Sequence, residues 1–156
     1  MLRMSKLTDY GTLVLSELAA RGSDSASAGT VAGKTHLTLP TVSKLLKALT
    51  RSGLVVSTRG AQGGYRLARA PAEITAAEII DALEGPVAIT QCSSDEGSCT
   101  LEAFCRVGRA WQRINLSIRE ALDDITLADL QDVQQSVPPP NLRSHLKLPA
   151  NPTVEN

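Results

Sequence analysis

The fold is decided by the stretch Thr38-Leu-Pro-Thr-Val-Ser-Lys-Leu-Leu-Lys-Ala-Leu-Thr-Arg51, which combines a helix start with two unlike faces. Thr38 is suited to cap a helix, and Pro40 is suited to its first turn because that position needs no backbone N–H. Apolar residues recur at helical spacing along one side, and polar or basic residues occupy the other. The apolar positions are Val42, Leu45, Leu46 and Leu49, and the polar positions are Thr41, Ser43, Lys44, Lys47 and Arg51. With a short helix expected over residues 30–36 and Gly53 as the stop, the pattern predicts a helix-turn-helix.

A β-hairpin is predicted directly after this helix. Leu54-Val-Val-Ser-Thr58 is rich in β-branched residues, and Tyr65-Arg-Leu67 alternates as a returning strand. Between them lies the glycine-rich turn Arg59-Gly-Ala-Gln-Gly-Gly64. One interpretation is an ordinary hairpin turn that needs glycine. The other is a wing whose Arg59 reaches the DNA backbone or the minor groove, and we favour it because a basic helix precedes the hairpin.

Further helices are predicted on both sides of this unit. A first helix is expected over residues 5–21, and Thr75 with Glu78 forms a capping box that starts a short helix closed by Gly85. A long helix is predicted from about residue 106 and a last short one from Thr126. An apolar seam runs along the long helix through Val107, Trp111, Ile114, Ile118, Ala121 and Ile125. The seam could pack on its own domain, but we favour a homodimer because two-fold symmetry suits a winged helix on duplex DNA.

The expected fold class is therefore mainly α with a small β-hairpin wing: a winged helix-turn-helix followed by a long dimerisation helix. The expected organisation is a DNA-binding region over residues 1–70, a linking helix and cysteine segment over 71–105, a dimerisation helix with a short helix over 106–133, and a disordered tail over 134–156. The tail is assigned from its prolines and its low apolar content.

Charge is divided unevenly along a chain whose formal net charge is zero. Residues 1–70 contain ten Lys and Arg and three acids, giving +7, whereas residues 71–137 contain four Arg and twelve acids, giving −8. One interpretation is that surface charges cluster by chance. The other is that a basic, polyanion-binding module is joined to an acidic second part. No apolar run approaches the roughly 18 residues of a membrane span, and the N-terminus lacks a signal-peptide core. We therefore expect a cytoplasmic protein with no membrane partner.

All three cysteines, Cys92, Cys99 and Cys105, fall in one short serine- and glycine-containing segment. An odd number of cysteines argues against a disulfide framework, and three clustered thiols suggest a soft-metal site. The spacings fit structural zinc poorly, because zinc usually takes four ligands in short pairs. A metal-free thiol redox switch stays open as another interpretation.

The sequence resembles the Rrf-two-type winged-helix regulators from Met1 to about Val133, and the SUF-system repressor branch, related to IscR and NsrR, in particular. The marks of this resemblance are Lys6-Leu-Thr-Asp-Tyr-Gly11, Pro40-Thr-Val-Ser-Lys44, Gly53-Leu-Val55, Arg59-Gly60, Gly63-Gly-Tyr65, Glu84-Gly-Pro86 and the three cysteines before Trp111. The resemblance implies an iron–sulfur cluster held by Cys92, Cys99 and Cys105.

The resemblance leaves the fourth cluster ligand open. IscR-type members supply a histidine three residues after the last cysteine, where this sequence has Gly108, which cannot ligate. NsrR-type members use an acidic residue near the N-terminus of the partner subunit, and Asp9 stands at the matching position as the candidate ligand. The other interpretation of Asp9 is a solvated or capping carboxylate. Glu96, Glu102, a small thiol and water also stay open, as do a two-iron and a four-iron cluster.

The implied function is a dimeric transcription factor that binds a double-stranded DNA operator and represses genes for iron–sulfur cluster assembly. Thr41 and Ser43 are expected to read bases, Lys44, Lys47 and Arg51 to contact phosphates or base edges, and Arg59 to act from the wing. Alternatives are a thiol-redox or nitric-oxide-responsive regulator and an iron–sulfur carrier protein. An enzyme is not expected, because the sequence offers no nucleophile–base pair, phosphate loop or substrate-pocket signature.

Overall fold

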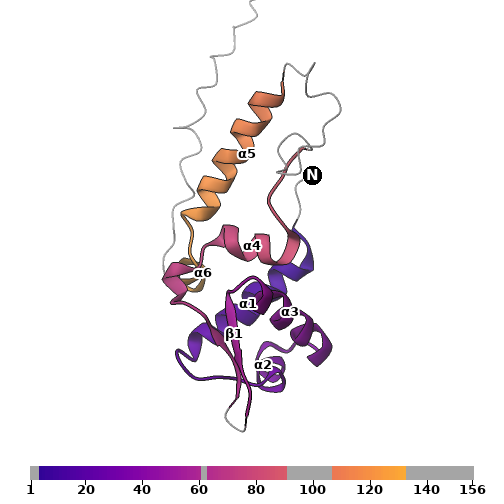
Figure 1. Ribbon diagram of the computed structural model, residues 1–156, viewed down its shortest axis with the longest axis vertical. Coiled ribbons are helices and arrows are strands. Elements are labelled where there is room, and N and C mark those ends of the chain that lie inside the picture. The colour runs from indigo at the N-terminus through magenta and orange to yellow at the C-terminus, as the bar shows by residue number, and fades with distance from the viewer. Residues whose placement is uncertain (1–3, 61–62, 91–106, 133–156) are drawn as a thin grey trace, which may run out of the picture.

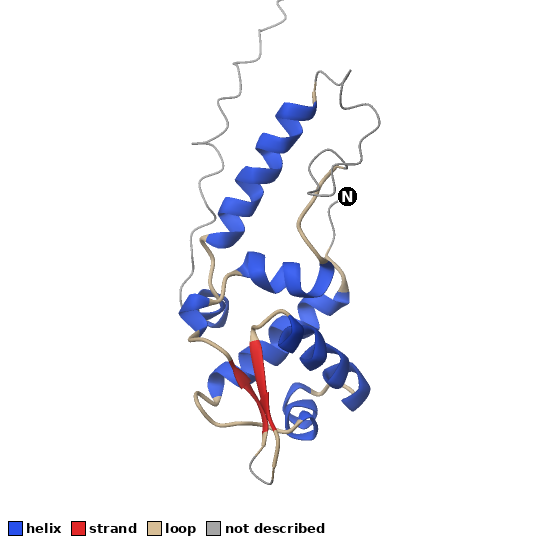
Figure 2. Ribbon diagram, viewed as in Figure 1, coloured by secondary structure: helices blue, strands red, loops and turns tan. Residues whose placement is uncertain are grey.

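The computed structural model describes residues 4–60, 63–90 and 107–132, which form a helical body with one two-stranded hairpin (Figures 1 and 2). The expected fold class, mainly α with a small β-hairpin wing, is confirmed. The elements in chain order are α1 (Lys6–Ala20), α2 (Ala28–Thr35), α3 (Leu39–Arg51), β1 (Val55–Thr58), β2 (Gly64–Leu67), the 3-10 turn η1 (Pro71–Glu73), α4 (Ala76–Glu84), α5 (Gly108–Asp123) and α6 (Leu127–Gln131).

The helix starts follow from capping side chains. Ser5 caps α1 and Thr75 caps α4, the latter through the expected capping box with Glu78. The second helix begins at Ala28, two residues before the expected start, because the Ser27 hydroxyl accepts a hydrogen bond from the Thr30 N–H at 3.1 Å. His36 ends that helix with a left-handed backbone, φ 57°.

The wing is an antiparallel pair in which Val55 faces Leu67 and Thr58 faces Gly64. At its tip Gly63 admits no side chain, since an added Cβ would lie 2.4 Å from the Thr58 carbonyl oxygen. The hairpin is anchored to the body by two backbone hydrogen bonds between Ala26 and Tyr65, at 2.8 and 2.9 Å.

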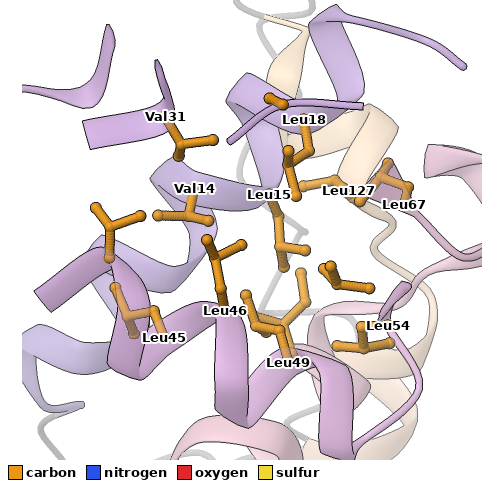
Figure 3. Packing of buried hydrophobic residues seen from close by; sticks show 14 of the residues in the cluster. Val14, Leu15, Leu18, Val31, Leu45, Leu46, Leu49, Leu54, Leu67 and Leu127 are labelled. Atoms are coloured by element: carbon orange, nitrogen blue, oxygen red, sulfur yellow. The ribbon is translucent and has the colours of Figure 1, made fainter. Parts of the chain in front are cut away.

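The core joins α1, α2, α3, the wing, α4 and α6 (Figure 3). The predicted apolar side of α3 is fully buried in it, which confirms that part of the sequence pattern. Leu127 of α6 is 0% exposed and lies in the same cluster as Leu15 and Leu46, so the apolar core extends beyond residue 70. The functional division at residue 70 stays a prediction.

Along the longest axis α5 lies at one end and the tip of the hairpin at the other, with α4 between α5 and the rest of the body (Figure 1). This places the candidate dimerisation helix and the candidate DNA-contacting wing far apart. Within the described ranges, no helix is both long and apolar enough to cross a membrane.

Candidate nucleic-acid interface and its connection to the cysteine segment

The polar side of α3 is exposed, as its sequence pattern predicted. Ser43, Lys44, Lys47 and Arg51 are all exposed, whereas the opposite side of the helix is buried. None of the ion pairs in the described part of the chain involves these three cations. Their charge is therefore available to an external anion.

Thr41 differs from its neighbours on this face. It is half-buried, and its hydroxyl shares a hydrogen bond of 2.9 Å with the hydroxyl of Thr38. One of the two hydroxyls gives its single O–H to this bond. Because Thr41 is also less exposed than Ser43, Ser43 is the better presented of the two residues predicted to read bases.

Arg59 is exposed and lies directly after β1, immediately before Gly60, whose φ of 113° is strongly disfavoured for residues with a side chain. It is not part of any ion pair within the described ranges. An exposed arginine beside a glycine turn can approach a phosphate backbone or a narrow groove closely. Residues 61–62 of the turn lie outside the described ranges.

A second group of polar contacts ties α5 to α4 and to the segment that leads toward the cysteines. The Arg119 guanidinium donates to both oxygens of Asp81, at 3.1 and 2.7 Å. Asn115 accepts a hydrogen bond from the Ile89 N–H at 3.2 Å and donates one to the Val87 carbonyl at 3.0 Å. A side-chain amide satisfies both backbone groups at once because its oxygen accepts and its NH₂ group donates.

A third contact ties α4 to α1. One carboxylate oxygen of Glu84 accepts hydrogen bonds from the Ser5 hydroxyl at 2.5 Å, the Ser5 N–H at 2.9 Å and the Thr8 hydroxyl at 2.6 Å. The Ser5 and Thr8 hydroxyls lower the pKa of Glu84 because they stabilise its ionised form. Sequence reasoning did not identify this contact or the two on α5, because the partners lie far apart along the chain.

The three cysteines, with Glu96 and Glu102, lie outside the described residues. Among the residues that are described, no group of three His, Cys, Asp or Glu side chains could hold a metal ion. Asp9 lies exposed in the first turn of α1, and Gly108 is the first residue of α5. Thr90 is the last described residue before the cysteine segment, and Val107 is the first after it.

The seam of α5 is open to solvent in the single chain. Val107 is 58% exposed, Trp111 39% and Ile114 44%, while Ile118 and Ile125 are half-buried. An apolar stripe on a long helix is normally covered, so this surface is available to a partner.

Comparison with known proteins identifies a family of regulators. The family model that matches, Rrf2, described as iron-dependent transcriptional regulator, covers residues 4–133. The transcriptional regulator CymR of Bacillus subtilis is 35% identical over 130 residues, which cover 83% of this chain and 89% of that protein. These relatives are named as regulators, in agreement with the expectation that the chain is not an enzyme.

The chain is also similar to solved structures of transcriptional regulators. The structure of B. subtilis CymR, described as the global cysteine regulator, matches with a TM-score of 0.66 at 36% identity over 84% of this chain and 97% of that one. T. potens IscR matches with a TM-score of 0.61 at 35% identity, covering 83% and 85%. An oxidised form of Staphylococcus aureus CymR matches with a TM-score of 0.59 at 30% identity, covering 84% and 97%.

Proposed function

This chain belongs to the Rrf2 family of transcriptional regulators, and from that premise we propose that it binds operator DNA under the control of an iron–sulfur cluster. The observation that carries the DNA-binding part is the exposed basic side of α3, where Lys44, Lys47 and Arg51 take part in no ion pair of the described chain. In a winged helix this helix enters the major groove, and Arg59 would add a contact from the wing.

Cys92, Cys99 and Cys105 would hold the cluster. Three thiols are the soft donors that iron–sulfur clusters take, and their spacing is unlike that of structural zinc sites. Gly108 offers no ligand, whereas Asp9 is exposed and its carboxylate takes part in no ion pair or side-chain hydrogen bond of the described chain, which supports it as the proposed fourth ligand from a partner subunit. When bound, such a cluster supplies a redox-sensitive iron centre.

The proposed dimer uses the α5 seam. Trp111 and Ile114 are exposed in the single chain, and covering them with the same helix of a second copy would remove a large apolar surface from water. A two-fold dimer also presents two recognition helices to successive major grooves, about 34–36 Å apart.

The contacts around α4 support coupling between cluster and DNA. Asn115 on α5 is hydrogen-bonded to the backbone of residues 87–89, and Arg119 on the same helix is hydrogen-bonded to Asp81 on α4. Glu84 at the end of α4 is hydrogen-bonded to the start of α1. A conformational change in the segment between Thr90 and Val107 would shift the residues that make these contacts. It would thereby alter the angle between the DNA-binding units of the two subunits in the proposed dimer.

The proposal is tested by anaerobic purification of the full chain with iron and sulfide counting. We expect a brown protein that binds a promoter fragment of cluster-assembly genes with different affinity before and after cluster removal. Cys99→Ser should lose iron and sulfide, whereas the control Ser98→Ala in the same segment should keep both. A colourless protein that contains zinc or no metal would overturn the cluster.

A second candidate is a thiol-responsive regulator, favoured by the similarity to an oxidised S. aureus CymR. In that case the cysteines themselves would be oxidised, with no metal involved. Metal-free protein separates the two: operator affinity that changes on adding peroxide, and returns with a thiol reductant, supports the thiol switch. We also propose that the chain represses SUF-type genes for iron–sulfur cluster assembly. Binding to promoter fragments of those genes tests this part of the proposal.

A further inference from the structure

The first turn of α3 differs in chemistry from the rest of its outer face. Thr38, Leu39 and Pro40 are exposed, and none carries a charge or an amide. The cations Lys44 and Lys47 follow one and two turns later. The helix therefore presents a neutral end and a basic end to whatever it contacts.

Leu39 is the most conspicuous residue of the neutral end. It is 50% exposed and is not among the side chains packed on the core, unlike Leu37 two residues earlier. It precedes Ser43 by four residues, so the two lie one turn apart on the same side of α3. The fold thus gives no packing reason for a leucine at this position.

Hydrogen-bond readout is restricted at this end of the helix. Leu39 and Pro40 have no side-chain donor or acceptor, and the hydroxyls of Thr38 and Thr41 bond each other at 2.9 Å. The residues at the start of a recognition helix are the ones that reach base edges. The apolar group that the major groove offers them is the 5-methyl group of thymine.

We infer that Leu39, with Pro40 beside it, selects a pyrimidine 5-methyl group in each operator half-site. The inference rests on the proposed DNA-binding function and adds its base preference. The same chemistry would accept 5-methylcytosine. Phosphate contacts from Lys44 and Lys47 position the helix, and the methyl contact supplies discrimination at one base pair.

The test begins with selection of binding sites from a random duplex pool by the full chain. Each thymine of the selected site is then replaced in turn by deoxyuridine, which removes only the methyl group. We expect one position in each half-site at which the wild type binds about fourfold more weakly, the effect of one buried CH₂-sized group. At that position a C·G pair should bind weakly, and 5-methylcytosine should recover about fourfold.

Two variants assign the effect to Leu39. Leu39→Ala should bind the thymine duplex about fourfold more weakly and lose no further affinity on the deoxyuridine duplex. The control Lys47→Ala should weaken binding to both duplexes by the same factor and keep the fourfold ratio between them. Because Leu39 is exposed, its truncation should leave the thermal midpoint unchanged.

Two results would overturn the inference. The first is a wild type whose affinity does not fall when any thymine is replaced by deoxyuridine. The second is a Leu39→Ala variant that loses as much affinity on that replacement as the wild type does. Both leave sequence-selective binding intact and so leave the proposed function standing. Failure of the pool to yield any enriched site, with binding that is equal for all duplexes, would count against the proposed function itself.

Discussion

Charged side chains are used in opposite ways on α3 and at the junction of α4 with α5. On α3, Lys44, Lys47 and Arg51 are exposed and outside every ion pair of the described chain. At the junction, Arg119 binds Asp81 through two hydrogen bonds, with side-chain exposures of 37% and 28%. The cations of α3 are therefore not neutralised within the described chain, whereas the ion pair at the junction joins two helices.

This difference in pairing predicts which charged side chains affect binding and which affect stability. An exposed, unpaired cation adds little to folding, so removing it should affect binding alone. A paired side chain between two helices should affect stability first, and binding only through the position of α5.

The largest effect should come from the combined variant Lys44→Ala, Lys47→Ala and Arg51→Ala. Each phosphate contact releases condensed counterions, so three lost contacts should weaken operator binding roughly 100-fold at about 0.15 M salt. The slope of log affinity against log salt should fall by about 1 for each contact. Fluorescence anisotropy over a salt series measures both, and the thermal midpoint should stay unchanged because the positions are exposed.

Lys6→Ala is the matched control for the single variant Lys47→Ala. Lys6 is an exposed lysine at the start of α1 and is not part of α3. Lys6→Ala removes the same charge as Lys47→Ala, so a general effect of net charge would lower the salt slope equally in both variants. That outcome would contradict the assignment of the α3 face.

A smaller effect is expected at the junction. Asp81→Ala leaves the Arg119 guanidinium without its bidentate partner on α4, and should destabilise the fold by about 1 kcal/mol, the upper end for a partly exposed pair. The thermal midpoint should fall by about 3 °C for a chain of this length. Arg21→Ala breaks the pair between Glu17 and the C-cap residue of α1 and should cost less, about 0.3–0.5 kcal/mol. Equal losses from the two variants would show that the junction is not held by its ion pair.

The two regions also differ in how far the sequence predicts them. The α3 face follows from a local rule, because a helical repeat assigns Val42, Leu45, Leu46 and Leu49 to the core and leaves the basic residues outside. The fold class follows in the same way from caps, glycine turns and β-branched runs. Leu39 was visible at the end of this pattern, but its exposure is a tertiary fact.

The junction could not be predicted locally. Asp81 and Arg119 are 38 residues apart, Asn115 and Val87 are 28 apart, and Ser5 and Glu84 are 79 apart. Helical periodicity assigns a residue to a face but does not say which face of another helix meets it. An asparagine one residue after Ile114 in an otherwise apolar seam was the one signal available, since such a residue commonly satisfies a backbone group.

The smallest effect is expected at Glu84, where pH tests the paired kind of charge. Its pKa is lowered from the ordinary value of 4.5 by the Ser5 and Thr8 hydroxyls, so its ionised form stabilises the native state. A lowered pKa gives stability that is present above pH 4.5 and is lost as pH falls through the folded value. Glu84→Gln should therefore be less stable than the wild type at pH 7, by about 0.5 kcal/mol because the site is exposed, and the difference should shrink only as the pH falls below 4.5. Urea unfolding at pH 7 and at a series of pH values below 4.5 measures it. A Glu84 difference that is constant with pH would mean that shape rather than charge holds α4 to α1.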